Sequence, residues 1–236
     1  ILVTLFVKRK YDLQCDVEPD DEAISQRWHG LGHHLAYLLH HNADITLLTL
    51  FADLKDVSVY AVYSLVVSSL RQLVSTCFTS LEASFGNMIA KKETSTLEKN
   101  FSAFEFSVFA VTTILFTSAA LLILPFVSLY TRGVDDADYW RPLLSGLMVL
   151  SEAIYCIRTP YNAVILAAGH YKETSKAAYL EAFINIFLSL VLVKKAGITG
   201  VVLGTVVAMS FRTIQCALYL ARNILYRNVG PFVKKH

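Results

Sequence analysis

Charged residues are scarce in this sequence: Asp, Glu, Lys and Arg make up 17% of it, against about 25% in a typical soluble domain. Hydrophobic residues make up 55%. The net charge is only +2, and no basic patch interleaved with aromatic residues occurs, which argues against nucleic-acid binding. The composition therefore predicts an all-α, polytopic membrane protein.

Cysteine is also rare, with four residues scattered at Cys15, Cys77, Cys156 and Cys216. No CxxC pair and no Cys/His spacing of a zinc site occurs, so we expect neither disulfides nor a metal. HExxH and Asp-rich motifs are absent as well. A membrane glycosyltransferase or ligase would need a large external loop, and the longest one expected here is the short stretch 131–142. We therefore predict that the chain is not an enzyme.

Long apolar runs divide the chain into segments that could cross a bilayer, which takes about 20 helical residues. The predicted spans are 31–54, 57–81, 101–131, 143–168, 177–193 and 201–221, with a polar loop at 86–100. We expect three regions: the end of a preceding helix with a cytoplasmic linker (1–30), a six-span lobe (31–222) and a basic cytoplasmic tail (223–236). The chain opens on Ile1 within the apolar run ILVTLFV, so we expect a fragment of a longer protein.

Lysine and arginine fall unevenly on the two sides that this topology defines. Of the 21 in the sequence, one set of loops holds 13 and the other holds 5, with Arg71, Arg158 and Arg212 left inside the spans. Loops rich in Lys and Arg stay cytoplasmic. Both ends of the lobe are therefore predicted to lie inside the cell.

The span 143–168 is the one around which we expect the lobe to be organised. It carries Glu152, Arg158 and Pro160 at a depth where a charge costs about 2.5 to 3.5 kcal/mol. Such groups usually face a bundle interior or a watery cavity, and a proline frees a backbone carbonyl that also needs a partner. We interpret this span as a lumen-facing transporter helix. The alternative is a contact between Arg158 and Glu152 that only ties helices together.

Arg71, Arg158 and Arg212 form a group of arginines within the spans. The planar guanidinium fork suits phosphate oxygens, so three sheltered arginines could line a cationic cavity for a pyrophosphate or an acidic sugar. In the alternative they pair with three acidic residues of the spans, Asp44, Glu152 and Glu181. Arg71 and Arg212 could also extend to the cytoplasmic surface.

The first complete span carries an unusual number of polar residues. Asn42 and Asp44 sit where it should be deepest, and a carboxylate there needs a cation, a proton or a hydrogen-bonding partner. They are candidates for H⁺ or Na⁺ coupling, or else Asp44 pairs with an arginine. The pairs His33/His40 and His34/His41 each lie on one helical face, which we interpret as a sheltered polar face or a membrane edge rather than a metal site.

Several segments resemble the carboxy-terminal half of Wzx-type polysaccharide (O-antigen) flippases of the multidrug/oligosaccharidyl-lipid/polysaccharide exporter superfamily, the MATE/MOP group. The likeness runs from about His33 to Arg227. The segments that carry it are HHNADITLLTLF, DVSVYAVYSLVVSSLRQLV, FGNMIAKKE, FEFSVFAVTTILF, LPFVSLYTRGVDDADYWRP, IRTPYNAVILAAGHYKET and GVVLGTVVAMSFRTIQ. The most specific are Asn42-x-Asp44 and the PYN…AGHYK run, which contains Tyr161 and Asn162.

The resemblance implies a six-helix lobe of a two-lobe transporter in the bacterial cytoplasmic membrane, with the amino-terminal lobe missing. Such proteins move an undecaprenyl-pyrophosphate-linked oligosaccharide to the outer leaflet, alongside polysaccharide polymerases and glycosyltransferases. Asn42 and Asp44 match a polar motif of the lobe's first helix, and Arg158 matches an arginine on a lumen-facing helix. Tyr161 and Asn162 would also face the lumen. Cation-coupled multidrug exporters share the fold and provide the alternative function.

Overall fold

The computed structural model describes Phe6, Arg9, Lys10 and residues 27–78, 81–134 and 136–225. The predictions for the run ILVTLFV, for most of the linker 11–30 and for the tail after residue 225 lie outside these residues. The side chains of His40 and His41 lie outside them too.

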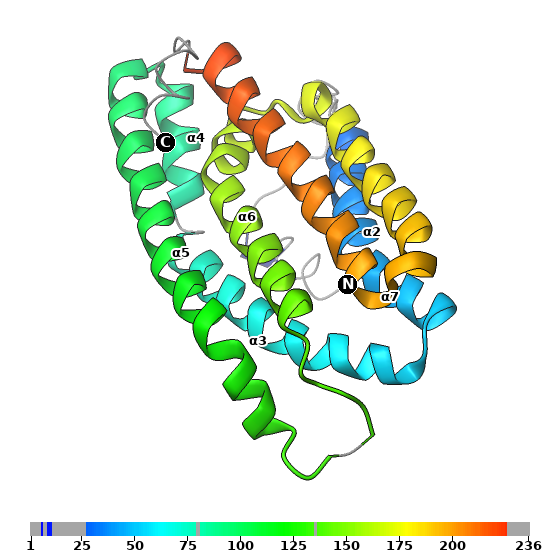
Figure 1. Ribbon diagram of the computed structural model, residues 1–236. Coiled ribbons are helices and arrows are strands. Elements are labelled where there is room, and N and C mark those ends of the chain that lie inside the picture. The colour runs from blue at the N-terminus through cyan, green and yellow to red at the C-terminus, as the bar shows by residue number, and fades with distance from the viewer. Residues whose placement is uncertain (1–5, 7–8, 11–26, 79–80, 135, 226–236) are drawn as a thin grey trace.

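Helices make up the ordered elements of the described residues, as the sequence predicts. The helices are α2 (Arg27–Phe51), α3 (Leu54–Phe78), α4 (Glu82–Ala90), α5 (Thr94–Tyr130), α6 (Pro142–Ala167) and α7 (Tyr171–Asn223). α2 packs mainly on α7, and α6 packs on both α5 and α7 (Figure 1). α6 therefore lies between the other long helices, with a different neighbour on each side.

The predicted helix 143–168 is confirmed as α6, to within one residue at each end. Pro142 occupies its first turn, where a proline has no hydrogen bond to lose and its φ angle already suits a helix. Gly169 follows with φ of 74°, a left-handed conformation that ends the helix with little strain. Pro160 lies inside the helix.

The predicted loop at 86–100 is wrong. α4 and α5 cover most of it, and only residues 91–93 separate the two helices. The polar composition misled the prediction, because apolar residues in and beside this stretch still bury one face of each helix. Phe85 just before it, Leu97 within it and Phe101 just after it are buried in the core, while its lysines are exposed.

α7 is a hairpin of two antiparallel arms rather than one rod, which Figure 1 shows as the yellow and the orange-to-red ribbons. The chain turns at Gly197, whose φ of 55° and ψ of −138° lie outside the helical region. The arms then approach closely: a Cβ on Gly200 would lie 2.5 Å from the carbonyl oxygen of Leu192, and one on Gly204 would lie 2.8 Å from Ser189 Oγ. The two glycines have only a hydrogen atom in place of a side chain, so the arms can come this close. Close contacts through small residues are common between membrane helices.

Three of the described helices, α3, α5 and α7, are long and apolar enough to cross a membrane. α2 and α6 are also long, at 25 and 26 residues, but are not among these three. The outer surface of α5 is apolar, with Phe106, Ile114 and Leu121 between 67% and 75% exposed. Exposed apolar side chains of this size suit a lipid environment. These three helices support the prediction of a membrane protein, and the count of six spans remains a prediction.

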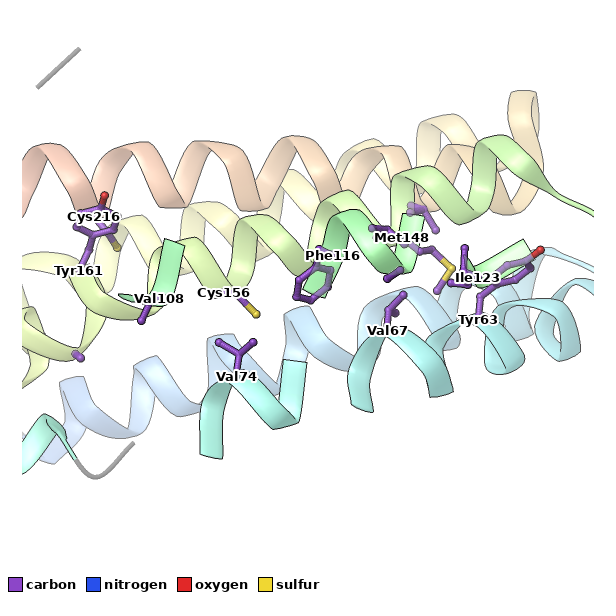
Figure 2. Close-up of a cluster of buried hydrophobic side chains, with 14 of the residues drawn as sticks. Tyr63, Val67, Val74, Val108, Phe116, Ile123, Met148, Cys156, Tyr161 and Cys216 are labelled. Atoms are coloured by element: carbon purple, nitrogen blue, oxygen red, sulfur yellow. The ribbon is translucent and has the colours of Figure 1, made fainter. Parts of the chain in front are cut away.

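The apolar core lies where α3, α5 and α6 meet, and Figure 2 shows Val67, Phe116 and Met148 pointing toward one another there. Tyr63 on α3 is fully buried, and its hydroxyl donates a hydrogen bond of 2.6 Å to the carbonyl of Tyr139. Most of the buried polar side chains lie elsewhere, on α2, α6 and the two arms of α7. The apolar core and most of the buried polar side chains thus lie on different sides of the bundle, and the polar side is where we expect a functional site.

Candidate functional site

A cavity of about 360 Å³ lies between α2, α3, α6 and the start of α7, and we name it the arginine cavity. Its polar and aromatic lining comprises His33, His34, Tyr37, Ser75, Tyr155, Arg158, Thr159, Asn162, Tyr171, Glu181 and Arg212. It lies near the end of α6 and the start of α7, which is the end of the bundle predicted to be cytoplasmic. Of the predicted lumen residues, Arg158, Arg212 and Asn162 line it.

Two arginines share one carboxylate in the arginine cavity. Arg158 Nη1 lies 2.5 Å from Glu181 Oε1, and Arg212 Nε lies 3.7 Å from Glu181 Oε2. Arg212 also donates to the Thr174 carbonyl at 3.2 Å and to Gln215 Oε1 at 2.5 Å. Arg212 is only 3% exposed, so it does not extend to the surface. Two guanidiniums and one carboxylate leave a formal charge of +1 in this group.

Arg71 on α3 contacts the ring of Tyr155, which lines the same cavity. The Tyr155 ring has the Arg158 guanidinium 4.9 Å from its centroid and the Arg71 guanidinium 5.2 Å from it. Arg71 Nη1 also lies 3.5 Å from Glu152 Oε2. Tyr155 was not among the predicted site residues. Its position one turn after Glu152 and one turn before Arg158 in α6 was the signal that could have identified it.

A second cavity, of about 200 Å³, lies between α2, α3, α6 and the second arm of α7, and we name it the aspartate cavity. Its polar lining comprises Asn42, Asp44, Tyr60, Ser64, Ser151, Glu152 and Thr205. Asp44 is 4% exposed. Its carboxylate accepts hydrogen bonds from Thr205 Oγ1 at 2.7 Å, from Tyr60 Oη at 3.4 Å and from Asn185 Nδ2 at 3.4 Å.

The α7 partners of Asp44 were missed as site residues by sequence reasoning. Asn185 Nδ2 donates to Thr205 Oγ1 at 2.8 Å, which joins the two arms of α7. Asn185 Oδ1 is buried without a hydrogen-bond partner in the described part of the chain. Glu181, Asn185 and Ser189 recur every four residues in an apolar helix, and this spacing was the signal for an inward polar face.

The ion pairs differ from the alternatives that the sequence left open. Arg158 pairs with Glu181 rather than with Glu152, which pairs with Arg71. Asp44 is held by uncharged donors on α3 and α7 instead of by an arginine. Among the residues that the structure describes, the three arginines therefore pair with Glu152 and Glu181.

Two predicted site residues lie differently from the others. Asn42 borders the aspartate cavity but is exposed, and its Nδ2 donates to the Leu38 carbonyl of its own helix at 2.8 Å. Tyr161 lies in the core, where its hydroxyl donates a hydrogen bond of 2.8 Å to Glu105 Oε1. Glu105 is buried there. Tyr161 precedes Asn162 by one residue, so it points about 100° away around the helix.

The histidines do not form a metal site among the described residues, in which no group of three or more His, Cys, Asp and Glu side chains could hold an ion. His33 Nε2 lies 3.0 Å from the Tyr171 carbonyl and 3.2 Å from Thr174 Oγ1. His34 is exposed at the edge of the arginine cavity. The interpretation of His33 as part of a sheltered polar face agrees with these contacts.

Comparison with family models, curated proteins and solved structures finds no match to this chain. The chemistry of the two cavities therefore indicates which ligands the bundle could bind. The arginine cavity offers guanidinium donors and aromatic rings, which suit a phosphate-bearing ligand with attached sugars. The aspartate cavity offers a buried carboxylate and hydroxyl oxygens, which suit a proton or a small cation.

Proposed function

We propose that this chain is a lobe of a bacterial flippase that moves an undecaprenyl-pyrophosphate-linked oligosaccharide across the cytoplasmic membrane. The observation that carries the proposal is the arginine cavity, which places Arg158 and Arg212 inside an otherwise apolar bundle. A buried arginine in a membrane protein usually marks a substrate or ion pathway. The resemblance to Wzx-type flippases supports the same substrate class.

The chemistry of the cavity fits a diphosphate that carries sugars. An arginine fork binds phosphate oxygens through paired hydrogen bonds and keeps its charge at any physiological pH. Tyr37, Tyr155 and Tyr171 add aromatic surface against which sugar rings could pack. A volume of about 360 Å³ falls within the usual range of ligand sites.

The topology supports loading from the cytoplasm. In the proposed lobe, α2, α3, α5, α6 and the two arms of α7 each cross the membrane, and α2 and α6 turn their polar faces toward each other and toward α7. Lysine-rich segments adjoin the helix ends near the arginine cavity. The positive-inside rule assigns such segments to the cytoplasm. Function would require the amino-terminal lobe, and the glycosyltransferases and the polymerase of the pathway would be working partners.

In this proposal Asp44 is the coupling residue. Its carboxylate is buried beside a cavity, with Thr205 and Asn185 around it. Binding of H⁺ or Na⁺ would neutralise it. Neutralising this carboxylate would shift the equilibrium between an inward-facing and an outward-facing arrangement of α2 and the two arms of α7.

The proposal is tested with Arg158→Ala and Arg158→Lys in the intact protein, expressed in a strain that lacks its own copy. Export of surface polysaccharide should fall at least about tenfold in Arg158→Ala and partly recover in Arg158→Lys, because lysine keeps the charge but loses the fork. Arg141→Ala, an exposed loop variant, is the control. Normal export by Arg158→Ala at normal protein levels would refute the role of the arginine cavity.

A second candidate function, cation-coupled export of hydrophobic drugs, is favoured by the aspartate cavity. Met148, Val202 and Met209 line it together with Asp44. Apolar side chains beside an acidic anchor suit cationic drugs, and methionine adapts to varied shapes. Drug resistance conferred by the intact protein and lost in Asp44→Asn, with unchanged polysaccharide export, would select this function.

A further inference from the structure

Glu181 occupies the position between two arginines that an anionic ligand of the arginine cavity would need. It reaches into the cavity from the first arm of α7 and is 7% exposed. One carboxylate oxygen contacts Arg158 on α6, and the other faces Arg212 on the second arm of α7. The same carboxylate therefore contacts both of the buried guanidiniums that line this cavity.

An internal counter-ion is physically required when the cavity is empty. A guanidinium buried without a partner is strongly unfavourable, and removing one member of a buried ion pair leaves such a charge. Arg158 cannot relieve this by losing its proton. Glu181 supplies the compensating charge in the unloaded protein, and a phosphate that binds Arg158 must compete with it.

The two arginines have different partners, which indicates at which of them a phosphate would replace Glu181. Arg212 keeps two uncharged acceptors, the Thr174 carbonyl and Gln215 Oε1, and lies 3.7 Å from Glu181. Arg158 lies 2.5 Å from Glu181, and its guanidinium plane is covered by the Tyr155 ring at 4.9 Å. Its contact with Glu181 is therefore the interaction that a ligand has to replace.

We propose that Glu181 is an internal competitor of the substrate, a carboxylate that holds Arg158 in the unloaded protein and is displaced from it by the diphosphate of the ligand. This inference rests on the proposed function, because it takes the arginine cavity as the diphosphate site. Displacement leaves a negative charge in the loaded cavity. Glu181 thereby weakens binding of the headgroup and favours its release on the opposite side of the membrane.

The experiment is calorimetric titration of inorganic pyrophosphate into the purified full chain in detergent. The variants are Glu181→Gln and, as a matched control, Glu105→Gln, which removes the same charge from a buried carboxylate in the core. Glu181→Gln should bind pyrophosphate at least about tenfold more tightly than wild type, because Arg158 is then without its counter-ion. Glu105→Gln should bind as wild type does.

The outcomes separate the inference from the proposed function. Wild type that binds pyrophosphate, with a folded Glu181→Gln variant that binds it no more tightly, overturns the inference and leaves the proposed function standing. Failure of both proteins to bind overturns the diphosphate site and the inference with it. If Glu181→Gln does not fold, Glu181→Asp is the variant that tests the inference. Its shorter side chain withdraws from Arg158, so it should also bind pyrophosphate more tightly than wild type does. Unchanged or weaker binding refutes the inference.

Discussion

The arginine cavity and the aspartate cavity lie in one helical bundle but keep their buried charges in different ways. In the first, two guanidiniums share the carboxylate of Glu181, and Tyr155 covers the face of one of them. In the second, Asp44 is held by hydroxyl and amide groups that carry no charge. The first group has a formal charge of +1, and the second has the single charge of Asp44.

This difference follows from the chemistry of the two side chains. Arginine stays protonated under all physiological conditions, so its burial requires a permanent counter-ion. A carboxylate can instead take up a proton or a cation, and neutral donors hold it in place without fixing its charge. The first cavity is thus suited to exchange one anion for another, and the second is suited to gain and lose a cation.

Arg71 links the two cavities. It forms an ion pair with Glu152, which lines the aspartate cavity, and it contacts the ring of Tyr155, which lines the arginine cavity. Glu152 and Tyr155 are neighbours on one turn of α6. A change of charge at one cavity therefore has a short physical route to the other.

The largest effect is expected from Arg71→Ala. Glu152 would lose its ion-pair partner while it stays mostly buried, which should lower the free energy of unfolding by about 3 kcal/mol. Thermal unfolding of the purified protein in detergent measures this. Arg141→Ala, which breaks an exposed pair with Asp138, should change stability by less than about 1 kcal/mol. An Arg71→Ala variant as stable as wild type would refute a stabilising role of the Arg71–Glu152 ion pair.

The next effect concerns the cation selectivity of the aspartate cavity. If Na⁺ is the coupling ion, replacing choline chloride by sodium chloride should stabilise the wild type by about 2.7 kcal/mol at 100 times the dissociation constant. Asp44→Asn should abolish this shift and leave pyrophosphate binding intact. Asp53→Asn, at an exposed position, serves as the control. Equal stabilisation of wild type and Asp44→Asn would place the ion elsewhere, and absence of a shift in wild type would favour H⁺.

The smallest effect is expected at Tyr155. Tyr155→Phe keeps an aromatic ring beside both guanidiniums, whereas Tyr155→Leu removes it. Since a partly desolvated cation–π contact contributes about 1 kcal/mol, Tyr155→Leu should weaken pyrophosphate binding by roughly fivefold, and Tyr155→Phe by less than twofold. Calorimetric titration distinguishes these values. Equal losses in both variants would assign the role to the hydroxyl group rather than to the ring.

Much of the fold was predictable because it depends on local composition and periodicity. The boundaries of α6 and the turn between the two arms of α7 agree with the predicted spans, with Gly169 after α6 and Gly197 at the turn. The first arm of α7 begins at Tyr171, earlier than the predicted span 177–193. The helices across 86–100 were not predictable from its polar character, since they are anchored by Leu97 within the stretch and by Phe85 and Phe101 beside it, which are all buried in the core. Tertiary packing overrode composition there.

The sequence by itself determined that arginines and carboxylates would lie within apolar helices, and therefore that they would need shelter and partners. The choice of partners was decided only by the tertiary structure. Glu181 joins Arg158 to Arg212, and Asn185 and Thr205 reach Asp44, because the turn at Gly197 folds the two arms of α7 together against α2 and α6. Ion pairs join residues far apart in the chain, and only the packing of the helices sets the distances between them.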